Sequence, residues 1–477
     1  MSKSARKPAL WQAAVMILIP VGIILYGTVV MHIMPPVVPL LLAVIAAASC
    51  ALLMGIPWET LQKGMFDALT RSQIAIYILI LVGALIGVWI QCGTIGMVIY
   101  WGLKLISAKW FFLAAFIVAA IASTITGTSF GCIGTVGVAF YGIGTALGYP
   151  AGMILGPIVG GAILGDKMSP VSDSTNIAAS NCETDLFEHI GSMMYTTFPA
   201  AIIACICYSF MGSPMEGAGD VVVAQVRTII QTLEQHSNLS FLTLLPPVTL
   251  FTLAWRRFPV IPTLVLSILA GVLVALLNGA SVDSLIKAAT SGFVSDTGVK
   301  SVDSLLSRGG MLSVLPTLLL FIASLSFGGI LEISGVFGTI IDVILRWATT
   351  LTRLIGSTLF VAFCILLGTG NMMLASIMTG RAFAGAYRER GIHSKVLSRT
   401  CEDSATVLSI LIPWSVPAFF VMGVLGVSAW EFMPYCYFNV LCPVFALIYA
   451  RTGFGIWNLE GKPLRTVGEE NEKSTFE

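Results

Sequence analysis

The stretch "GDKMSPVSDSTN", Gly165 to Asn176, is a dense polar segment in a chain that is otherwise mostly apolar. It follows the apolar run "MILGPIVGGAILG", and a second long apolar run begins soon after it. Pro170 lacks a backbone N–H and would interrupt a helix at this point. The stretch therefore predicts a helix that is broken part of the way through an apolar layer.

The composition predicts what that layer is. Of the 477 residues, 57% are hydrophobic and only 10% are charged, and apolar runs of roughly 20 residues, the length that crosses a bilayer, recur along the chain. Its 47 glycines and 21 prolines are tolerated in membrane helices that are packed, bent or interrupted. We therefore expect an all-α polytopic membrane protein with about 10 to 12 membrane segments, whose first partner is the lipid bilayer.

Composition also limits the partners and cofactors. A net charge of +1 gives no indication of a nucleic-acid partner. The ten cysteines form no C-x-x-C pair and lie mostly in apolar runs, so buried thiols are expected rather than a zinc site. No cofactor is predicted, and a homodimer is compatible with the pattern without being required by it.

Four pairs of segments suggest an internal duplication. "GVWIQCGTIG" (Gly87 to Gly96) matches "GILEISGVFG" (Gly329 to Gly338) with glycines at the same three places and an offset of 242. The same offset places "TGTS", residues 126–129, on "GTGN", residues 368–371. "WETLQKG" matches "VDSLIKA" at an offset of 224, and "SDST" matches "EDSA" at 230. Four matches in the same order favour a repeat, although glycines that pack helices closely would give part of this pattern.

Basic residues in the loops predict the topology. The N-terminus, which leads into a retained first helix, and the basic loops of both halves are expected in the cytoplasm, and the neutral or acidic loops 211–240 and 279–308 outside. The basic residues are Lys3, Arg6, Lys7, Lys63, Arg71, Arg256, Arg257, Arg381, Arg388, Arg390, Lys395 and Arg399. The acidic residues of the outer loops are Glu216, Asp220, Glu234, Asp283, Asp296 and Asp303.

These positions require an odd number of crossings in each half, so the two halves are expected to be inverted repeats. Segments 111–147 and 358–384 then become re-entrant hairpins with polar tips. The predicted boundaries are residues 1–238 for the first repeat with its N-terminal helix, 239–460 for the second, and 461–477 for a cytoplasmic tail. Inverted repeats with discontinuous helices are typical of secondary transporters, whose site lies near the midplane.

The polar stretch has the chemistry of a cation site. An unwound segment frees carbonyl oxygens, and with hydroxyls and a carboxylate these are ligands that a hard cation prefers. A carboxylate at membrane depth costs about 2.5 to 3.5 kcal/mol on insertion scales and is seldom present without a use. The candidate residues are Asp166, Ser169, Ser172, Asp173, Thr175 and Asn176. An aqueous loop with helix-capping serines and aspartates is the alternative.

A second polar cluster favours the cation site over that alternative. "CEDSATVLSILIPWS" places Glu402, Asp403, Ser404 and Thr406 at the start of an apolar run that Pro413 interrupts. Polar residues at the predicted hairpin tips are either substrate-facing turns or close helix contacts. These tip residues are Thr126, Thr128, Ser129, Thr369 and Asn371.

At these residues the chain resembles a known family. "GDKMSPVSDSTN", the following "DLFEHI", and "LSRTCEDSATVLSILIPW" are similar to motifs of the NhaC family of sodium/proton antiporters, in the ion transporter superfamily. The resemblance implies two re-entrant hairpins, two discontinuous helices, and exchange of sodium for protons across a bacterial inner membrane. It also implies elevator-like movement of a transport unit, and it covers most of the chain.

Carried onto this sequence, the resemblance assigns Asp166, Ser169, Ser172, Asp173 and Thr175 to the first motif and Glu402, Asp403, Ser404 and Thr406 to the second. The chain departs from the family where Ser415 follows Pro413 and Trp414, because asparagine is usual there. The family also includes exchangers of malate for lactate and carriers of amino-acid-like solutes.

These observations lead to one mechanistic hypothesis. Asp173 carries sodium and protons in turn, Asp403 completes the sodium site from the other repeat, and Asp166 pairs with Lys167 to hold the break open. Ser172, Thr175, Ser404 and Thr406 supply neutral oxygens. A carrier of small organic anions coupled to sodium or protons is the alternative, and an intramembrane hydrolase and a passive channel are the rivals from other classes. An enzyme is not expected.

Overall fold

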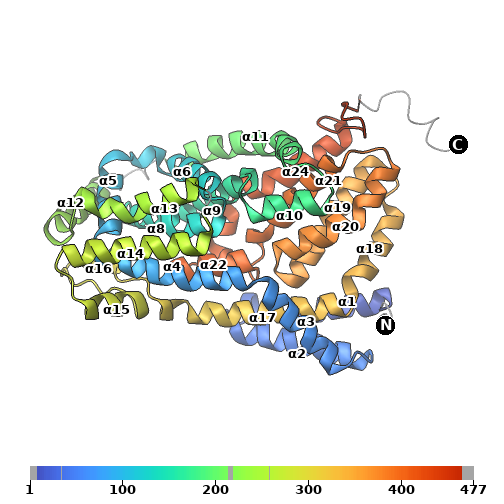
Figure 1. Cartoon of the computed structure of the whole chain (residues 1–477), viewed down its shortest axis with the longest axis horizontal. Helices are drawn as coiled ribbons and strands as arrows, with labels where there is room; N and C mark the ends of the chain where they lie inside the picture. Colours follow the sequence, from blue (N-terminus) through green and yellow to red (C-terminus); the bar gives the residue numbers. More distant parts are fainter. Residues whose placement is uncertain (1–7, 34, 213–218, 257, 465–477) are drawn as a thin grey trace.

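The computed structural model describes residues 8–33, 35–212, 219–256 and 258–464, and these fold into a bundle of helices (Figure 1). Within that part of the chain there is no strand, only two isolated bridges. Ten helices are long and apolar enough to cross a membrane, or twelve if each of two bent helix pairs forms one span. The predicted all-α polytopic fold with 10 to 12 segments is therefore confirmed.

The helices of the first half are α1 (Leu10–Leu25), η1 (Tyr26–Val30), α2 (Val37–Leu53), α3 (Trp58–Arg71), α4 (Gln73–Gln91), α5 (Thr94–Leu105), η2 (Ala108–Trp110), α6 (Phe111–Thr126), α7 (Ser129–Cys132), η3 (Ile133–Gly137), α8 (Val138–Ala146), α9 (Ala151–Met168), α10 (Asp173–Asn181), α11 (Leu186–Met211) and α12 (Gly219–His236). Those of the second half are η4 (Phe241–Leu244), α13 (Leu245–Trp255), α14 (Val260–Leu277), α15 (Val282–Thr290), α16 (Lys300–Leu306), η5 (Met311–Val314), α17 (Leu315–Ile333), α18 (Val336–Trp347), α19 (Leu351–Thr369), α20 (Met372–Glu389), α21 (Ser394–Cys401), η6 (Glu402–Thr406), η7 (Ser409–Leu411), α22 (Val416–Leu425), α23 (Ala429–Phe432), η8 (Met433–Tyr435) and α24 (Tyr437–Thr452).

The order of elements repeats between the halves. Helices α4 and α5 correspond in length and spacing to α17 and α18, at the offset of 242 that the glycine pattern gave. Each pair turns at a glycine in the left-handed region, Gly93 at φ 92° and Gly335 at φ 73°. A residue without a Cβ is favoured there. The match of "WETLQKG" with "VDSLIKA" also agrees with the structure, because its first residues, Trp58 and Val282, begin α3 and α15.

Each half then contains a helical hairpin with a tight tip. Helix α6 ends at Gly127 and the next helix is capped by Thr128, while α19 ends at Gly370 and α20 is capped by Asn371. The equivalent residues are thus 243 positions apart, so the alignment of "TGTS" on "GTGN" at 242 is wrong by one residue. The hairpins exist as helix–turn–helix units; their re-entrant course, the inversion of the halves and the repeat boundaries stay predictions.

Each half also contains a broken helix. The first break separates α9 from α10 at Ser169 to Ser172, and the second precedes α22 at Ile412 to Ser415. Pro170 and Pro413 again lie 243 positions apart. The match of "SDST" with "EDSA" is therefore wrong, because Glu402 to Thr406 form the π-helical turn η6 before the second break rather than the break itself.

Glycines let α9 approach α6 closely and so fix the depth of the first break. A Cβ at Gly161 would lie 2.2 Å from the carbonyl oxygen of Phe116, and one at Gly165 would lie 2.2 Å from that of Ala120. Small residues at such contacts are the usual means of tight packing between membrane helices. Any side chain at Gly165 would displace the end of α9, where the polar stretch begins.

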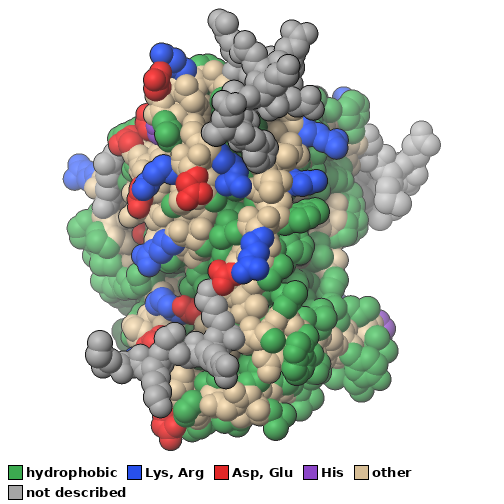
Figure 2. Space-filling model, turned by 90° about the vertical axis from the view of Figure 1, so that its right-hand side faces the viewer, with side chains coloured by type: hydrophobic (Ala, Val, Ile, Leu, Met, Phe, Trp, Pro, Cys, Tyr) green, Lys and Arg blue, Asp and Glu red, His purple; other side chains and the backbone are tan. Residues whose placement is uncertain are grey.

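Basic side chains gather at one end of the molecule (Figure 2). Helices α12, α15 and α16 lie at the left of Figure 1, and α18, α20 and α21 lie at the right. Figure 2 faces the right-hand end and shows many Lys and Arg side chains over its upper part. Of the residues used for the topology prediction, Lys3, Arg6, Lys7, Glu216 and Arg257 lie outside the described residues, as does the tail after residue 464.

Candidate functional site

A cavity of about 310 Å³ lies where both hairpin tips meet both broken helices. Its polar lining comes from the end of α3, the two tips and the first break. The lining residues that carry polar side chains are Arg71, Ser72, Thr128, Asp166, Ser172, Asp173, Ser174 and Asn371. Two apolar residues at the start of α22, Val416 and Pro417, close one side. Ser72 and Asn371, which are 299 positions apart in the sequence, thus line the same cavity.

Asp166 is the buried acid of this cavity, with 4% of its surface exposed. Its Oδ2 accepts a hydrogen bond from Ser129 Oγ at 2.6 Å, and its Oδ1 accepts one from Ser172 Oγ at 2.5 Å. Ser129 belongs to the first hairpin and Ser172 to the break, so one carboxylate joins both elements. Charge-assisted hydrogen bonds of this kind are short and strong.

The other polar residues of the stretch hold the break in shape. Thr175 Oγ1 donates to the carbonyl oxygens of Asp166 and Lys167, at 3.2 and 3.0 Å. The side-chain amide of Asn176 donates to the carbonyl of Pro170, and Ser169 Oγ donates to that of Thr124 on α6. Carbonyls freed by the break are thus partly satisfied by side chains, as backbone groups away from water require.

Asp173 has a different position from Asp166. It is the first residue of α10, lines the cavity, and has an exposed side chain. Ser172 caps this helix by accepting a hydrogen bond from Ser174 N at 3.2 Å. An acid in the first turn of a helix is stabilised by the helix dipole, so Asp173 places a negative charge at the mouth of the cavity.

The structure separates the predicted tip residues into two groups. Thr128 and Asn371 line the cavity, and Asn371 Nδ2 also donates to Ser72 Oγ at 3.0 Å. Ser129 reaches the cavity through Asp166. Thr126 and Thr369 instead donate to carbonyls of their own helices, at 2.9 and 2.8 Å.

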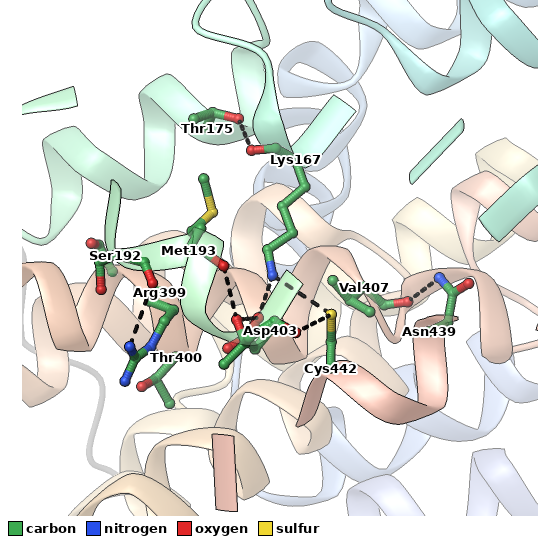
Figure 3. Close-up of polar contacts among 12 residues, drawn as sticks. Lys167, Thr175, Ser192, Met193, Arg399, Thr400, Asp403, Val407, Asn439 and Cys442 are labelled. Atoms are coloured by element: carbon green, nitrogen blue, oxygen red, sulfur yellow. Dashed lines mark hydrogen bonds and ion pairs between the residues drawn. The ribbon is translucent and has the colours of Figure 1, made fainter. Parts of the chain in front are cut away.

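The second predicted cluster does not join the first. Lys167 forms a buried ion pair with Asp403, and neither side chain has any exposed surface (Figure 3). The predicted pairing of Asp166 with Lys167 is therefore wrong. Consecutive residues on a helix point about 100° apart, so Asp166 faces the cavity while Lys167 faces η6.

Among the described residues, those that line the cavity include neither Glu402 nor Asp403. The expectation that Asp403 and Asp173 share one sodium ion is not supported by this separation. Ser404 Oγ donates to the carbonyl of Leu359 at 2.8 Å, and the carbonyl of Thr406 accepts from Ser409 Oγ at 2.6 Å. Glu402 is fully buried, and neither carboxylate oxygen has a hydrogen-bond partner of normal geometry within the described chain.

Sequence reasoning missed the contribution of α3. The charge pattern predicts a cytoplasmic loop at Arg71, but this residue is the last of α3 and lines the cavity. Its guanidinium makes a two-pronged ion pair with Glu332 of α17, with Nη1 3.0 Å from Oε1. A helix that includes Gln62, Lys63 and Asp67 has too few apolar residues to be recognised as part of a membrane segment.

Comparisons with known proteins identify the family. The model of the Na+/H+ antiporter family matches residues 161–454. The chain is similar to the Na+/H+ antiporter NhaC of Alkalihalophilus pseudofirmus, with 34% identity over 88% of this chain and 91% of the relative. It is also similar to two Bacillus subtilis proteins: the malate-2H+/Na+-lactate antiporter (32% identity, 95% of this chain and 97% of the relative) and the Na+/H+ antiporter NhaC (31% identity, 87% and 91%). The family match spans both breaks, and the chain is a multi-pass membrane protein that belongs to the Na+/H+ antiporter family.

Proposed function

We propose that this protein exchanges sodium ions for protons across the membrane, with the cavity at the hairpin tips as its ion site. The charge of the cavity carries the proposal. Among the described residues that line it, three are ionisable, and the only basic one of these, Arg71, is neutralised by Glu332. Asp166 and Asp173 remain, so the cavity attracts cations.

Asp166 is the carboxylate best placed to bind sodium and a proton in turn. It is buried and already fixed by two hydroxyls, whereas Asp173 is exposed at the mouth. In a low-dielectric site a carboxylate is favoured when it is protonated or paired with a cation. A sodium ion that enters can therefore displace the proton from Asp166, with hydroxyl and carbonyl oxygens of the break as further ligands. This assignment ranks Asp166 above Asp173.

Dequenching of a pH-sensitive dye in proteoliposomes tests the proposal. Vesicles with an imposed acid interior should become alkaline inside when sodium is added outside, and potassium chloride at the same concentration serves as the control. If the dye stayed quenched at every sodium concentration tested, the exchange of sodium for protons would be refuted.

A carrier of small organic anions is the second candidate. The cavity volume of about 310 Å³ is much larger than the space of a single water molecule, about 30 Å³ in the liquid, so it has room for more than one bare ion. In addition, one relative is a malate-2H+/Na+-lactate antiporter. The bidentate contact with Glu332 leaves Arg71 poorly suited to bind a carboxylate. Repeating the assay with malate and with lactate separates the candidates, because an anion carrier would respond to sodium only when its anion is present.

For the location we propose a bacterial inner membrane, with the basic end of the molecule in the cytoplasm. The basic segment from Arg381 to Arg399 belongs to α20 and α21, at the right of Figure 1. By the positive-inside rule this end faces the cytoplasm. Accessibility of single engineered cysteines to an impermeant maleimide in intact cells would test this orientation.

A further inference from the structure

The buried ion pair between Lys167 and Asp403 lies beside the cavity without taking part in it. It joins α9 of the first half to η6 of the second, and Thr196 Oγ1 of α11 donates to the same Asp403 oxygen at 3.0 Å. The thiol of Cys442 is 3.8 Å from Lys167 Nζ (Figure 3). These contacts fix the ammonium group firmly toward η6.

The position of Lys167 in the sequence makes its charge relevant to ion binding. Lys167 directly follows Asp166 at the end of α9, where Thr175 donates to the carbonyl oxygens of both residues. A cation bound at Asp166 would thus be close to a permanent ammonium charge. In a medium of low dielectric constant two like charges repel each other over distances that water would screen.

Stability alone gives no reason to keep such a pair. Replacing a buried ion pair with apolar residues of similar volume is often neutral or stabilising, whereas removing one partner leaves an uncompensated buried charge. Asp403 has one oxygen on Lys167 and Thr196, and its other oxygen has no hydrogen-bond partner among the described residues. We therefore infer that Asp403 serves to neutralise the charge of Lys167 rather than to stabilise the fold.

We propose that Asp403 is the counter-ion of Lys167 rather than a sodium ligand, and that this pair keeps positive potential away from the cation site at Asp166. The inference rests on the proposed function, because it assigns a role to residues beside that site. Lys167 and Asp403 are positioning residues: they act on sodium through the electrostatic potential at Asp166. Glu402, Arg399 and His189 are ionisable groups buried nearby, and every variant below leaves them unchanged.

A double-mutant cycle distinguishes a counter-ion from a ligand. Asp403→Asn leaves Lys167 unpaired, and we expect the sodium concentration for half-maximal dequenching to rise about tenfold or more, from repulsion between like charges at low dielectric. Adding Lys167→Gln removes the repelling charge, so the double variant should return to within about threefold of the wild type, a non-additive effect typical of contacting residues. A sodium ligand could not be rescued in this way.

Two further variants complete the experiment. Asp403→Glu keeps the negative charge and should stay close to the wild type, and Asp166→Asn with Lys167→Gln should remain inactive because the sodium ligand itself is lost. Thermal unfolding of each purified variant in detergent shows that it is folded. A double variant as weak as Asp403→Asn, or an unchanged Asp403→Asn, would overturn the inference while wild-type exchange stands. Absence of any wild-type response would refute the proposed function, and the inference with it.

Discussion

The two broken helices use the same backbone plan with different chemistry. Gly127 packs against Val171 of the first break, and Gly370 packs against Trp414 of the second, each 243 positions apart from its counterpart. Ser172 and Ser415 are the equivalent N-caps of α10 and α22. The backbone geometry has thus been kept in both halves.

The side chains at equivalent positions differ. In the first half Ser129 Oγ donates to Asp166, whereas in the second half Ser409, at the place of Asp166, donates to the Sδ of Met372, at the place of Ser129, at 3.8 Å. The carboxylate of Asp166 with its hydroxyl donor thus corresponds to the hydroxyl of Ser409, whose equivalent partner is the weakly accepting sulfur of Met372. The repeat therefore builds a symmetric frame, and only the first break supplies charge to the cavity.

Asp166→Asn should have the largest effect. Replacing the carboxylate removes the charge that binds the cation, a contact worth about 4 kcal/mol for unit charges 4 Å apart at an effective dielectric constant of 20, or roughly a thousandfold in affinity. Sodium-driven dequenching should be lost over the whole measurable range.

Ser409→Ala at the equivalent place of the second half is the matched control. Its hydroxyl donates to Thr406 O and Met372 Sδ, and neither acceptor is charged. Sodium affinity should therefore stay within about threefold of the wild type. Equal losses in the two variants would show that both breaks bind the ion, and the contrast between the halves would be wrong.

The sequence predicted the frame well because its signals are local. Pro170 and Pro413 mark both breaks, and a glycine with a following capping residue marks each hairpin tip. The family, the helical class and the number of membrane segments also followed from motifs and from apolar runs.

The side-chain partners could not be predicted in the same way. Whether Lys167 meets Asp166 or Asp403 depends on the direction of a side chain about 100° around a helix and on the packing of segments 236 residues apart. The π-helical turn η6 also changes the register of the acids against the second break. Neither the direction of the Lys167 side chain nor the π-helical turn can be inferred from the positions of polar residues in the sequence.

Asp173→Asn should have an intermediate effect. The side chain is exposed at the mouth of the cavity, where a unit charge contributes about 1 kcal/mol at the dielectric constant of water, or roughly fivefold in sodium affinity. Because exposed charges are screened by salt, the difference from the wild type should shrink when choline chloride is added. Complete loss of exchange at any ionic strength would instead restore Asp173 as the carrier and place the essential charge at the mouth.

The variants Ser172→Ala and Ser415→Ala remove equivalent N-caps and distinguish an effect on helix stability from an effect on ion binding. Each removes an N-cap, which costs about 0.5 to 2 kcal/mol, so both variants should lower the midpoint of thermal unfolding in detergent, and Ser172→Ala should lower it further because it also loses the hydrogen bond to Asp166. Only Ser172 also donates to Asp166, and a hydrogen bond to a charged group contributes about 1.5 to 3 kcal/mol. Sodium affinity should therefore change in Ser172→Ala alone; a comparable change in Ser415→Ala would contradict the asymmetry.

Ser415→Asn should have the smallest effect on transport, although it introduces the residue that is usual in the family. Asparagine is also a favoured N-cap, and the Ser415 hydroxyl accepts a hydrogen bond from Ala418 N at 3.2 Å. Ser415 is not among the described residues that line the cavity, whereas the next two, Val416 and Pro417, are. Sodium affinity and the preference for sodium over lithium should thus stay within about threefold, measured with both chlorides in the same vesicles. A tenfold shift in that preference would mean that the second break can supply an ion ligand, and the chemical difference between the halves would then be one of degree.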